Sequence, residues 1–385
     1  MYNLILYLYL LGVVVCSWFS EKVRTMWRGE RAAFRVLREQ VVPGSRYVWF
    51  HAASLGEFEQ GRPLMEQLRR MRPDLKVLLT FFSPSGYEVR KHYNGADIIC
   101  YLPLDTPFNA RRFLRLIQPE MVFFIKYEFW YNYLHILKRR GVPVYSVSSI
   151  FRDGQVFFRW YGRQYGRVLQ CFTHFYVQNE KSRELLASIG LSNVTITGDT
   201  RFDRVLEIKN SLTAKGLPWG EAPGGEAPKV FVAGSSWPPD EEMFIRYFRE
   251  HPGWQLIIAP HVIGEDHLQL IEKLLEGFKV ARYSSMLTPE RLTGCEAILI
   301  DCFGILSSIY RYATVAYVGG GFGVGIHNTV EAAVWGVPVI FGPNNEKFQE
   351  AQELKACGGG FEVKSYDAAS IIAENVESSS ENPNC

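Results

Sequence analysis

Residues 319–343 read GGGFGVGIHNTVEAAVWGVPVIFGP and carry the pattern on which the predicted fold depends. An apolar run at residues 315–318 precedes this stretch, and a second apolar run, residues 337–341, lies near its end. A glycine-rich turn and a helical pattern lie between the two runs. This order of strand, turn, helix and strand is typical of one repeat of a parallel α/β sheet.

The turn and helix of this stretch suit a nucleotide. Backbone N–H groups of a glycine-rich turn can approach an anion, and a helix N-terminus adds a partial positive charge. Glu331 lies three residues after Asn328, so on a helix both side chains can face one bound group. Amides would then hold phosphate and the carboxylate would hold sugar hydroxyls. The alternative is that the glycines only shape the turn and that Glu331 is a solvated helix residue.

The chain has 385 residues, which favours two domains over one core. Hydrophobic residues make up 47% and charged residues 21%, as in globular proteins. The net charge of +2 says little by itself, and we expect no nucleic acid among the partners. The seven cysteines are scattered without a C-x-x-C pair, which favours a reducing compartment and argues against a disulfide framework or a zinc site.

Residues 2–20 carry no charge, and four basic residues follow within residues 22–31. About 19 uncharged residues suffice to span a bilayer. A signal peptide would need a basic region before the apolar run and a clear cleavage site. A basic flank after the segment favours the cytoplasmic side. We therefore predict a membrane anchor over residues 1–31 holding a cytoplasmic body; the alternative is a buried or interfacial helix packed on that body.

Beyond the anchor, short apolar runs alternate with helical patterns, which predicts parallel sheets covered by helices on both faces. Residues 206–228 are rich in Gly and Pro and predict a linker. We expect two Rossmann-like domains, residues 32–205 and 229–385, facing a cleft that meets the carboxyl ends of the strands. Strands are predicted at residues 47–51, 76–81, 121–125, 143–147, 175–178, 229–233, 255–259, 297–300, 314–318 and 337–341.

Two carboxylates in the first half follow predicted strands. Glu57 falls near the start of a helix, where a carboxylate tends to stay ionised and could act as general base on an acceptor hydroxyl. The alternative is helix capping together with Ser54. Glu128 follows the strand at residues 121–125 and could orient an acceptor or donor group. Its alternative role is capping or pairing with Lys126.

Further candidates are basic groups and strand-end turns. Arg62 belongs to one of several arginine clusters, which suit either solvated helix faces or a surface for anionic lipid headgroups. In the second half, polar or glycine-rich turns follow four successive predicted strands. Besides the turn of the opening stretch, these are AGSS at residues 233–236, APH at 259–261 and DCFG at 301–304.

Five blocks, in the same order along the chain, resemble motifs of the 3-deoxy-D-manno-octulosonic acid (Kdo) transferases of lipopolysaccharide assembly, which have the GT-B glycosyltransferase fold. The similarity extends from the N-terminal anchor to about residue 363. HAASLGE (51–57) resembles H-A-x-S-x-G-E, YEFWYN (127–132) resembles T-E-L-W-P-N, GDTRFD (198–203) resembles G-N-x-K-F-D, DCFGIL (301–306) resembles D-T-x-G-E-L, and GIHNTVEAA (325–333) resembles G-G-H-N-x-L-E-P-A.

The resemblance implies an inverting glycosyltransferase that moves Kdo from CMP-Kdo to a hydroxyl of an anionic lipid A precursor and releases CMP. It implies a place at the cell inner membrane and no metal or other cofactor. Glu57 matches the family's general base, Glu128 a second carboxylate of the cleft, and Glu331 the position at the CMP ribose. The predicted donor site comprises Ser235, Ser236, His261, Gly304, Gly325, His327, Asn328 and Glu331, with charge contacts from Arg62 and from Arg201, which replaces a family lysine.

The chain departs from the family pattern at several positions. His261 stands where the family commonly has an arginine, Ile305 replaces a glutamate and Ile326 replaces a glycine. After residue 363 a short helical pattern runs into SSSENPNC, whereas the fold usually ends in helices that cross back onto the first domain. The alternatives are another GT-B enzyme, such as a different lipid-linked glycosyltransferase or a sugar-nucleotide epimerase, or a non-catalytic nucleotide-binding membrane protein.

Overall fold

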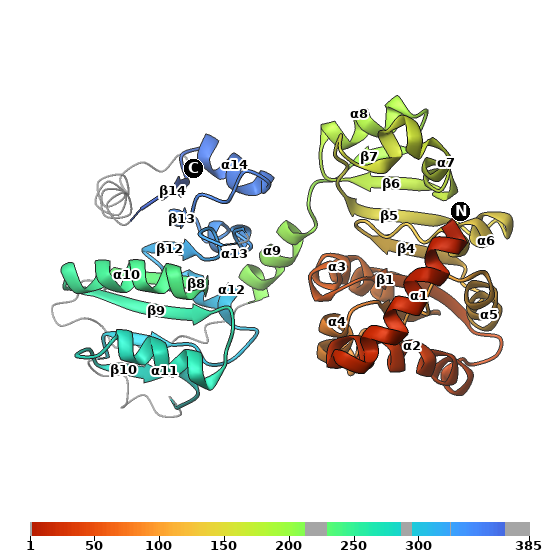
Figure 1. Ribbon diagram of the computed structural model, residues 1–385. Coiled ribbons are helices and arrows are strands. Elements are labelled where there is room, and N and C mark those ends of the chain that lie inside the picture. Colours follow the sequence, from red (N-terminus) through yellow and green to blue (C-terminus); the bar gives the residue numbers. More distant parts are fainter. Residues whose placement is uncertain (1, 212–228, 286–294, 324, 366–385) are drawn as a thin grey trace. The chain divides into compact units, whose positions relative to one another are not determined.

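The computed structural model of the chain describes residues 2–211, 229–285, 295–323 and 325–365. Its contacts divide the chain into two compact units, Met1–Arg204 and Val205–Cys385, and each unit contains its own sheet (Figure 1). The predicted linker begins inside a helix, α9 (Arg201–Ser211), and its remainder lies outside the described residues. The predicted C-terminal tail beyond residue 365 also lies outside them.

Unit 1 contains a seven-stranded parallel sheet in the order β3-β2-β1-β4-β5-β6-β7. The chain builds outward from β1 to one edge and then returns beside β1, so the strand order reverses between β1 and β4. Ligands of such sheets bind outside the carboxyl ends of the strands at this reversal. The strands are β1 (Arg46–Ala52), β2 (Leu75–Phe81), β3 (Ile98–Tyr101), β4 (Met121–Ile125), β5 (Val144–Ser149), β6 (His174–Val177) and β7 (Val194–Ile196).

Helices cover unit 1, as the sequence pattern predicts. They are α1 (Tyr2–Phe19), α2 (Glu21–Gln40), α3 (Leu55–Met71), α4 (Pro84–Arg90), α5 (Pro107–Ile117), α6 (Tyr131–Arg139), α7 (Arg163–Gly166) and α8 (Glu180–Ser188), with 3₁₀ turns η1 (Val156–Phe158), η2 (Trp160–Gly162) and η3 (Leu169–Cys171).

Unit 2 repeats the arrangement with the order β10-β11-β9-β8-β12-β13-β14, again with parallel pairs, and reverses between β8 and β12. Its strands are β8 (Lys229–Ser236), β9 (Trp254–Pro260), β10 (Val280–Arg282), β11 (Ala297–Leu299), β12 (Val315–Val318), β13 (Val339–Phe341) and β14 (Gly360–Glu362). Its helices are α10 (Pro238–Glu250), α11 (Glu265–Leu274), α12 (Leu306–Ile309), α13 (Val330–Ala333) and α14 (Gln349–Ala356), with η4 (Tyr283–Ser285) and η6 (Tyr310–Tyr312).

All ten predicted strands are present, and the structure adds four that the sequence analysis did not predict. These are β3, β7, β10 and β14, the outermost strands of the two sheets. Each has only three or four residues. An edge strand is paired on one side only, so it needs neither the length nor the continuous apolar run of a central strand.

Helix α5 illustrates how local sequence sets an element. Thr106 caps its start by accepting a hydrogen bond from the backbone N–H of Asn109 at 3.1 Å, and Pro107 occupies the first turn. Apolar residues at helical spacing, from Ala110 to Ile117, are buried against the sheet. Gln118 then adopts a left-handed conformation that ends the helix.

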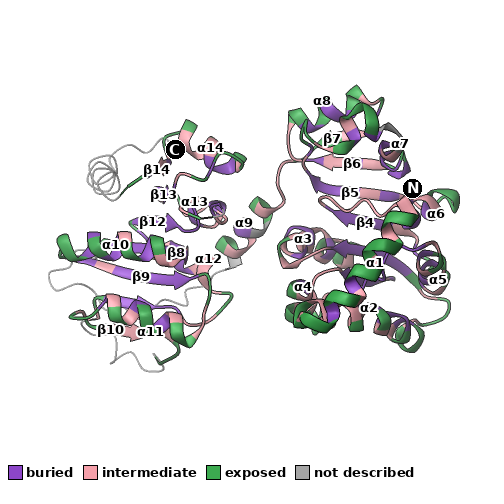
Figure 2. Cartoon of the chain, in the orientation of Figure 1, coloured by how far each residue is buried: buried purple, intermediate pink, exposed green. Residues whose placement is uncertain are grey.

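Helix α1 carries the apolar N-terminal segment. Among the described residues it is the one helix long and apolar enough to cross a membrane, with a mean hydropathy of 1.8. Only 11% of that window is buried, and α1 is mostly exposed in Figure 2. A buried core helix is therefore excluded for α1, whereas an anchor remains consistent with its surface.

The turn after β12 tolerates no side chain at Gly319. A Cβ placed there would lie 2.4 Å from the backbone oxygen of Ser235 and 2.7 Å from Cα of Ser236. Both neighbours are backbone atoms, so neither can rotate away.

We predict that Gly319→Ala destabilises unit 2 by about 1–3 kcal/mol because the added methyl group overpacks this turn. The expected result is a fall in melting temperature of roughly 3–10 °C, measured by circular dichroism on the intact chain. Gly264→Ala is the matched control, since its Cβ would meet nothing within 4 Å. Equal melting temperatures for Gly319→Ala and the wild type would contradict the close approach.

Candidate functional site

The first part of the candidate site lies at the strand reversal of unit 1. Strands β1 and β4 are neighbours there, with His51 paired to Phe124. Glu57 lies in the first turn of α3, directly after β1, and is half-buried. Its carboxylate accepts a hydrogen bond from the Ser54 hydroxyl. Ser54 is the N-cap residue, but its side chain does not bond the helix backbone. The Ser54 hydroxyl therefore binds the Glu57 carboxylate and does not cap the helix backbone.

Glu128 follows β4 and is fixed by two donors. Trp130 Nε1 donates to Glu128 Oε2 at 2.6 Å, and His51 Nε2 lies 3.1 Å from the same oxygen. An ionised carboxylate only accepts, so Nε2 carries the imidazole proton. His51 Nδ1 then accepts from the Thr80 hydroxyl at 2.8 Å, and Thr80 in turn accepts from Trp49 Nε1 at 2.8 Å. This chain of hydrogen bonds fixes the Glu128 carboxylate.

The two arginines predicted as charge contacts are both paired with carboxylates. Arg62 contacts Glu66 at 2.6 Å within α3. Arg201 contacts Asp199 at 2.6 Å, and Gln60 donates to the other Asp199 oxygen at 2.8 Å. Burial acts to raise the pKa of Asp199, but the hydrogen bonds and charge of Arg201 outweigh it and lower the pKa. Each arginine can still donate hydrogen bonds, but a neighbouring carboxylate already balances much of its positive charge.

The second part of the candidate site lies at the strand reversal of unit 2. Backbone hydrogen bonds join Gly319 N–H to Gly234 C=O and His261 N–H to Ser236 C=O, both at 2.9 Å, so the turns after β8, β9 and β12 lie together. The buried Asp240 carboxylate ties two of these turns to each other. It accepts from Trp237 N–H and from Gly320 N–H, each at 2.9 Å.

Three aromatic side chains stack at the ends of β8, β9 and β12. The His261 ring lies 4.2 Å from the His327 ring and 4.9 Å from the Trp237 ring, measured between centroids. Trp237 Nε1 donates to His327 Nε2 at 3.2 Å, so His327 is neutral with its proton on Nδ1. Burial, with a smaller contribution from His261, lowers the pKa of His327 to about 4. Burial also lowers the pKa of His261.

His261 stands at the position where the family commonly has an arginine. Burial lowers the pKa of the His261 imidazole and so disfavours its charged form, and the ring provides a flat stacking surface.

Glu331 lies beside Asn328, as predicted from their spacing. Asn328 Nδ2 donates to Glu331 Oε1 at 3.0 Å, and the Ser307 hydroxyl donates to Glu331 Oε2 at 2.6 Å. The carboxylate is thus fixed between the turn after β12 and helix α12, which follows the DCFG turn. An oriented carboxylate that retains open lone pairs suits a pair of sugar hydroxyls.

The glycine-rich turn itself differs from the predicted phosphate cradle. Amide groups at six of its positions donate to atoms of the protein; these are residues 319, 320, 323 and 325–327. Helix α13, which follows, has only four residues, so its dipole is small. The glycines at these positions mainly permit tight backbone packing, and Gly325, with φ of +133°, is one that requires glycine.

The remaining predicted donor residues are placed individually. Ser235 follows Gly234 in the β8 turn with φ of +53°. The Ser236 hydroxyl is buried and donates to Glu241 at 2.8 Å, so this hydroxyl is already engaged. Gly304, with φ of +89°, is exposed in the turn that leads into α12.

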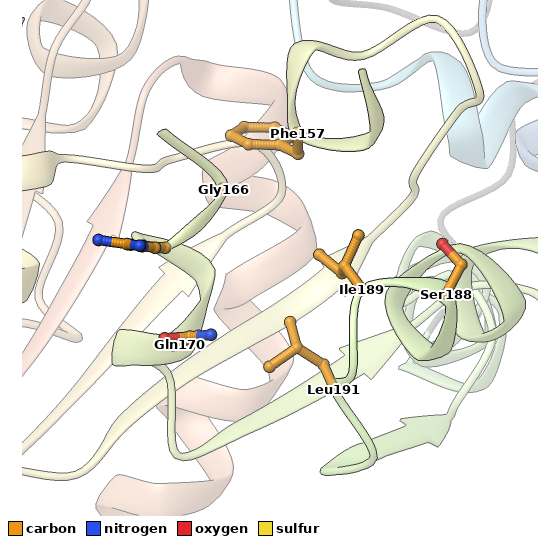
Figure 3. Close-up of a pocket in the computed structure, with 7 residues that line it drawn as sticks. Phe157, Gly166, Gln170, Ser188, Ile189 and Leu191 are labelled. Carbon is orange, nitrogen blue, oxygen red and sulfur yellow. The ribbon is translucent and has the colours of Figure 1, made fainter. Parts of the chain in front are cut away.

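No group of three or more His, Cys, Asp or Glu side chains suited to a metal ion occurs among the described residues. A pocket of about 450 Å³ lies in unit 1, lined by apolar side chains such as Phe157, Ile189 and Leu191 together with Gln170 and Ser188 (Figure 3). None of its lining residues belongs to the predicted site, so the pocket is unrelated to the features described above.

The sequence analysis missed four residues that position the site: His51, Thr80, Trp237 and Asp240. His51 stands first in the HAASLGE block, but nothing in the chain signals its contact with Glu128. Asp240 lies three residues after the cap residue of α10, the spacing of a capping box. The signal was hidden because Trp237, rather than Ser or Thr, occupies the cap.

Residues 27–204 match the sequence profile of the 3-deoxy-D-manno-octulosonic-acid transferase (kdotransferase) family. A 3-deoxy-D-manno-octulosonic acid transferase of Aquifex aeolicus is 29% identical over 326 residues, covering 82% of each chain. The enzyme of the same name from Haemophilus influenzae is 27% identical over 88% of this chain and 81% of its own length. These matches confirm the resemblance read from the five motif blocks.

The fold is confirmed by a solved structure. A putative UDP-N-acetylglucosamine 2-epimerase from Listeria monocytogenes superposes with a TM-score of 0.61, covering 87% of this chain and 88% of its own. Its sequence identity is 12%, so this likeness concerns the architecture alone. The chain has the GT-B fold predicted for it, with two Rossmann-like domains and an apolar N-terminal helix.

We predict that Thr80→Val lowers the stability of unit 1 by about 1–3 kcal/mol, because Trp49 Nε1 and His51 Nδ1 both lose their buried partner. The measurement is the melting temperature of the intact chain. Thr195→Val is the matched control, since Thr195 is an exposed strand threonine that contacts a single histidine. Equal effects of both substitutions would contradict the hydrogen-bond chain.

The lowered pKa of His327 predicts a pH dependence of stability. Between about pH 6.5 and pH 4 the unfolded chain binds a proton at this histidine and the folded chain does not, so stability falls as the pH falls. His327→Gln should flatten this fall, seen as a smaller decrease in melting temperature across the same interval. The exposed His92→Gln serves as control and should follow the wild type. An unchanged profile in His327→Gln would refute the assignment.

Proposed function

Because the chain is related to the Kdo transferases along most of its length, we propose that it transfers Kdo from CMP-Kdo to a hydroxyl of a lipid IVA-type lipid A precursor, with inversion at the anomeric carbon. The observation that carries the proposal is the place of Glu57, in the first turn of a helix directly after β1, at the strand reversal of the unit that the family profile matches. CMP is the leaving group, and no metal or other cofactor takes part.

In the proposed reaction Glu57 accepts the proton of the acceptor hydroxyl, while the oxygen of that hydroxyl attacks the anomeric carbon of Kdo. The bond from that carbon to the CMP phosphate oxygen breaks, and the electron pair leaves with CMP. The Ser54 hydroxyl orients the Glu57 carboxylate by its hydrogen bond. His51 and Trp130 hold the Glu128 carboxylate. We assign Glu128 the role of orienting a group of the acceptor or of the donor.

The donor is assigned to unit 2. The Glu331 carboxylate, oriented by Asn328 and Ser307, would accept hydrogen bonds from the CMP ribose. The stack of Trp237, His261 and His327 provides a flat, neutral surface beside it, and the turns at Ser235, Gly304 and Gly325 border the same strand ends. The Ser236 hydroxyl already donates to Glu241, so we assign Ser236 a structural role in the donor site. Arg62 and Arg201 are the assigned donors to anionic groups of the substrates.

The acceptor of this reaction is anionic and amphiphilic. We therefore place the enzyme at the cytoplasmic side of the inner membrane, with α1 as its anchor. The basic residues of α2, which follows α1, support this side because the cytoplasmic leaflet is rich in anionic lipids.

The test is incubation of the full chain with CMP-Kdo and a tetraacylated lipid A precursor, followed by mass analysis of the lipid. Glu57→Gln should lower the rate of transfer by roughly 10²–10⁴-fold and leave the binding of CMP unchanged, because a missing general base affects the chemical step. The control is Glu88→Gln on α4, where an exposed carboxylate pairs with Lys91. Transfer retained in Glu57→Gln would remove Glu57 from the mechanism, and no transfer by the wild type would sink the proposal.

A second candidate, an enzyme acting on a UDP-sugar such as a sugar-nucleotide epimerase, has the same architecture. The two candidates differ in the nucleotide that stabilises the protein. If CMP-Kdo is the donor, CMP should raise the melting temperature and UDP should not, since ligand bound to the folded state alone stabilises it. Stabilisation by UDP but not CMP would favour the epimerase. Binding of CMP without any transfer would favour a non-catalytic protein.

A further inference from the structure

Helix α1 presents two different surfaces along its whole length. One stripe is turned toward the body and is buried or half-buried; its residues, at helical spacing, are 2, 3, 6, 10, 13, 14 and 17. The other face is exposed and carries large apolar side chains, among them Leu4, Leu8, Leu11 and Trp18, whose exposed fractions are 62–73%. An apolar face of this extent marks an interaction surface.

The first turn of α1 is fastened to unit 1 by polar contacts. The Tyr2 hydroxyl donates to the buried Asp105 carboxylate at 2.8 Å, and Asn132 Nδ2 donates to Asn3 Oδ1 at 2.8 Å. The Tyr2 ring also lies 5.0 Å from the Tyr131 ring. These residues belong to the segment before α5 and to α6, elements of the unit 1 core.

The last turn of α1 is fastened to the same unit. Arg24 of α2 donates to the backbone oxygens of Ser17 and Trp18 at 2.9 and 2.8 Å. Helix α2 in turn buries Ala33, Phe34 and Leu37 in the unit 1 core. Both ends of α1 are therefore held by the same compact unit, and Figure 1 shows the helix running along it.

These contacts decide between the two ways in which α1 could meet a membrane. An α-helix of 18 residues is about 27 Å long. If α1 crossed the bilayer, Tyr2 and Trp18 would lie at opposite faces of the membrane, and the contacts of Tyr2 and Asn3 with unit 1 would break. We propose that α1 lies in the plane of the membrane surface, with its exposed apolar face in the lipid and its other face on unit 1.

The chemistry of α2 identifies the lipid. Arg28, Arg31, Arg35 and Arg38 are exposed and follow one another at helical spacing, so they form a basic stripe beside α1. Such a stripe suits anionic phospholipid headgroups. A second copy of the chain is disfavoured as occupant, because a symmetric contact through this surface would bring two basic stripes together.

Depth measurements test the in-plane position. A nitroxide label is attached at Leu4, Leu8, Leu11 or Val15, one at a time in a background without other reactive cysteines, and the protein is bound to sealed phosphatidylethanolamine–phosphatidylglycerol vesicles. All four positions lie on the exposed face. The proposal expects similar, shallow depths at all four. A maximum of depth at Leu8 and Leu11, with Leu4 near the far leaflet, would establish a spanning helix and overturn it.

Vesicle binding tests the basic stripe. The triple substitution Arg28→Gln, Arg31→Gln and Arg35→Gln should weaken binding to vesicles with phosphatidylglycerol by roughly tenfold or more, and salt should weaken wild-type binding in the same way. The control triple, Arg70→Gln, Arg183→Gln and Arg246→Gln, removes exposed arginines elsewhere and should bind as the wild type does. Equal loss in both triples, or a vesicle-free dimer disrupted only by the α2 triple, would overturn the proposal.

These measurements need no sugar donor. Failure of the transfer assay would leave the membrane proposal standing, and a spanning α1 would leave the proposed chemistry standing.

Discussion

Strands pair in parallel throughout both sheets, and this constraint decides where chemistry can lie in either unit. Parallel neighbours require a crossover between them, so all strands of a sheet end at the same edge. Where the order reverses, the two crossovers leave in opposite directions and the strand ends stay open. Glu57 and Glu128 follow β1 and β4 at one reversal, and Trp237 and His327 follow β8 and β12 at the other. The remaining contacts orient groups that this topology has already brought together.

The central strands and the fold class were predictable because a strand buried on both faces must be continuously apolar. The four edge strands were not predicted because an edge strand forms backbone hydrogen bonds on one side only. Three or four residues are then enough to form it, and so short a segment has no clear apolar pattern. The apolar N-terminal helix was recognisable from composition, but its packing on unit 1 was not. Tyr2 contacts Asp105, which lies 103 positions further along the chain, and no local sequence pattern predicts such a pair.

Contacts among the candidate residues were predictable where one short segment supplies both partners, and they were not predictable where distant segments do. The spacing of Asn328 and Glu331 was sufficient to pair them on one turn. The amides of the glycine-rich turn were assigned to phosphate, yet several of them donate to carbonyls of the turn itself and one donates to Asp240, an acid from another crossover. Composition indicates that a turn is tight; it does not tell which groups its amides already satisfy.

The contact between α1 and unit 1 also has a consequence for biosynthesis. The helix leaves the ribosome well before Asn132, which bonds to Asn3 and follows it by 129 residues. At ordinary elongation speeds this interval lasts roughly 6–26 s. During that time the first turn of α1 lacks its contact with α6, while α2 already contacts the last turn of α1. The exposed apolar face of the nascent segment can then be covered by a lipid surface or by a chaperone.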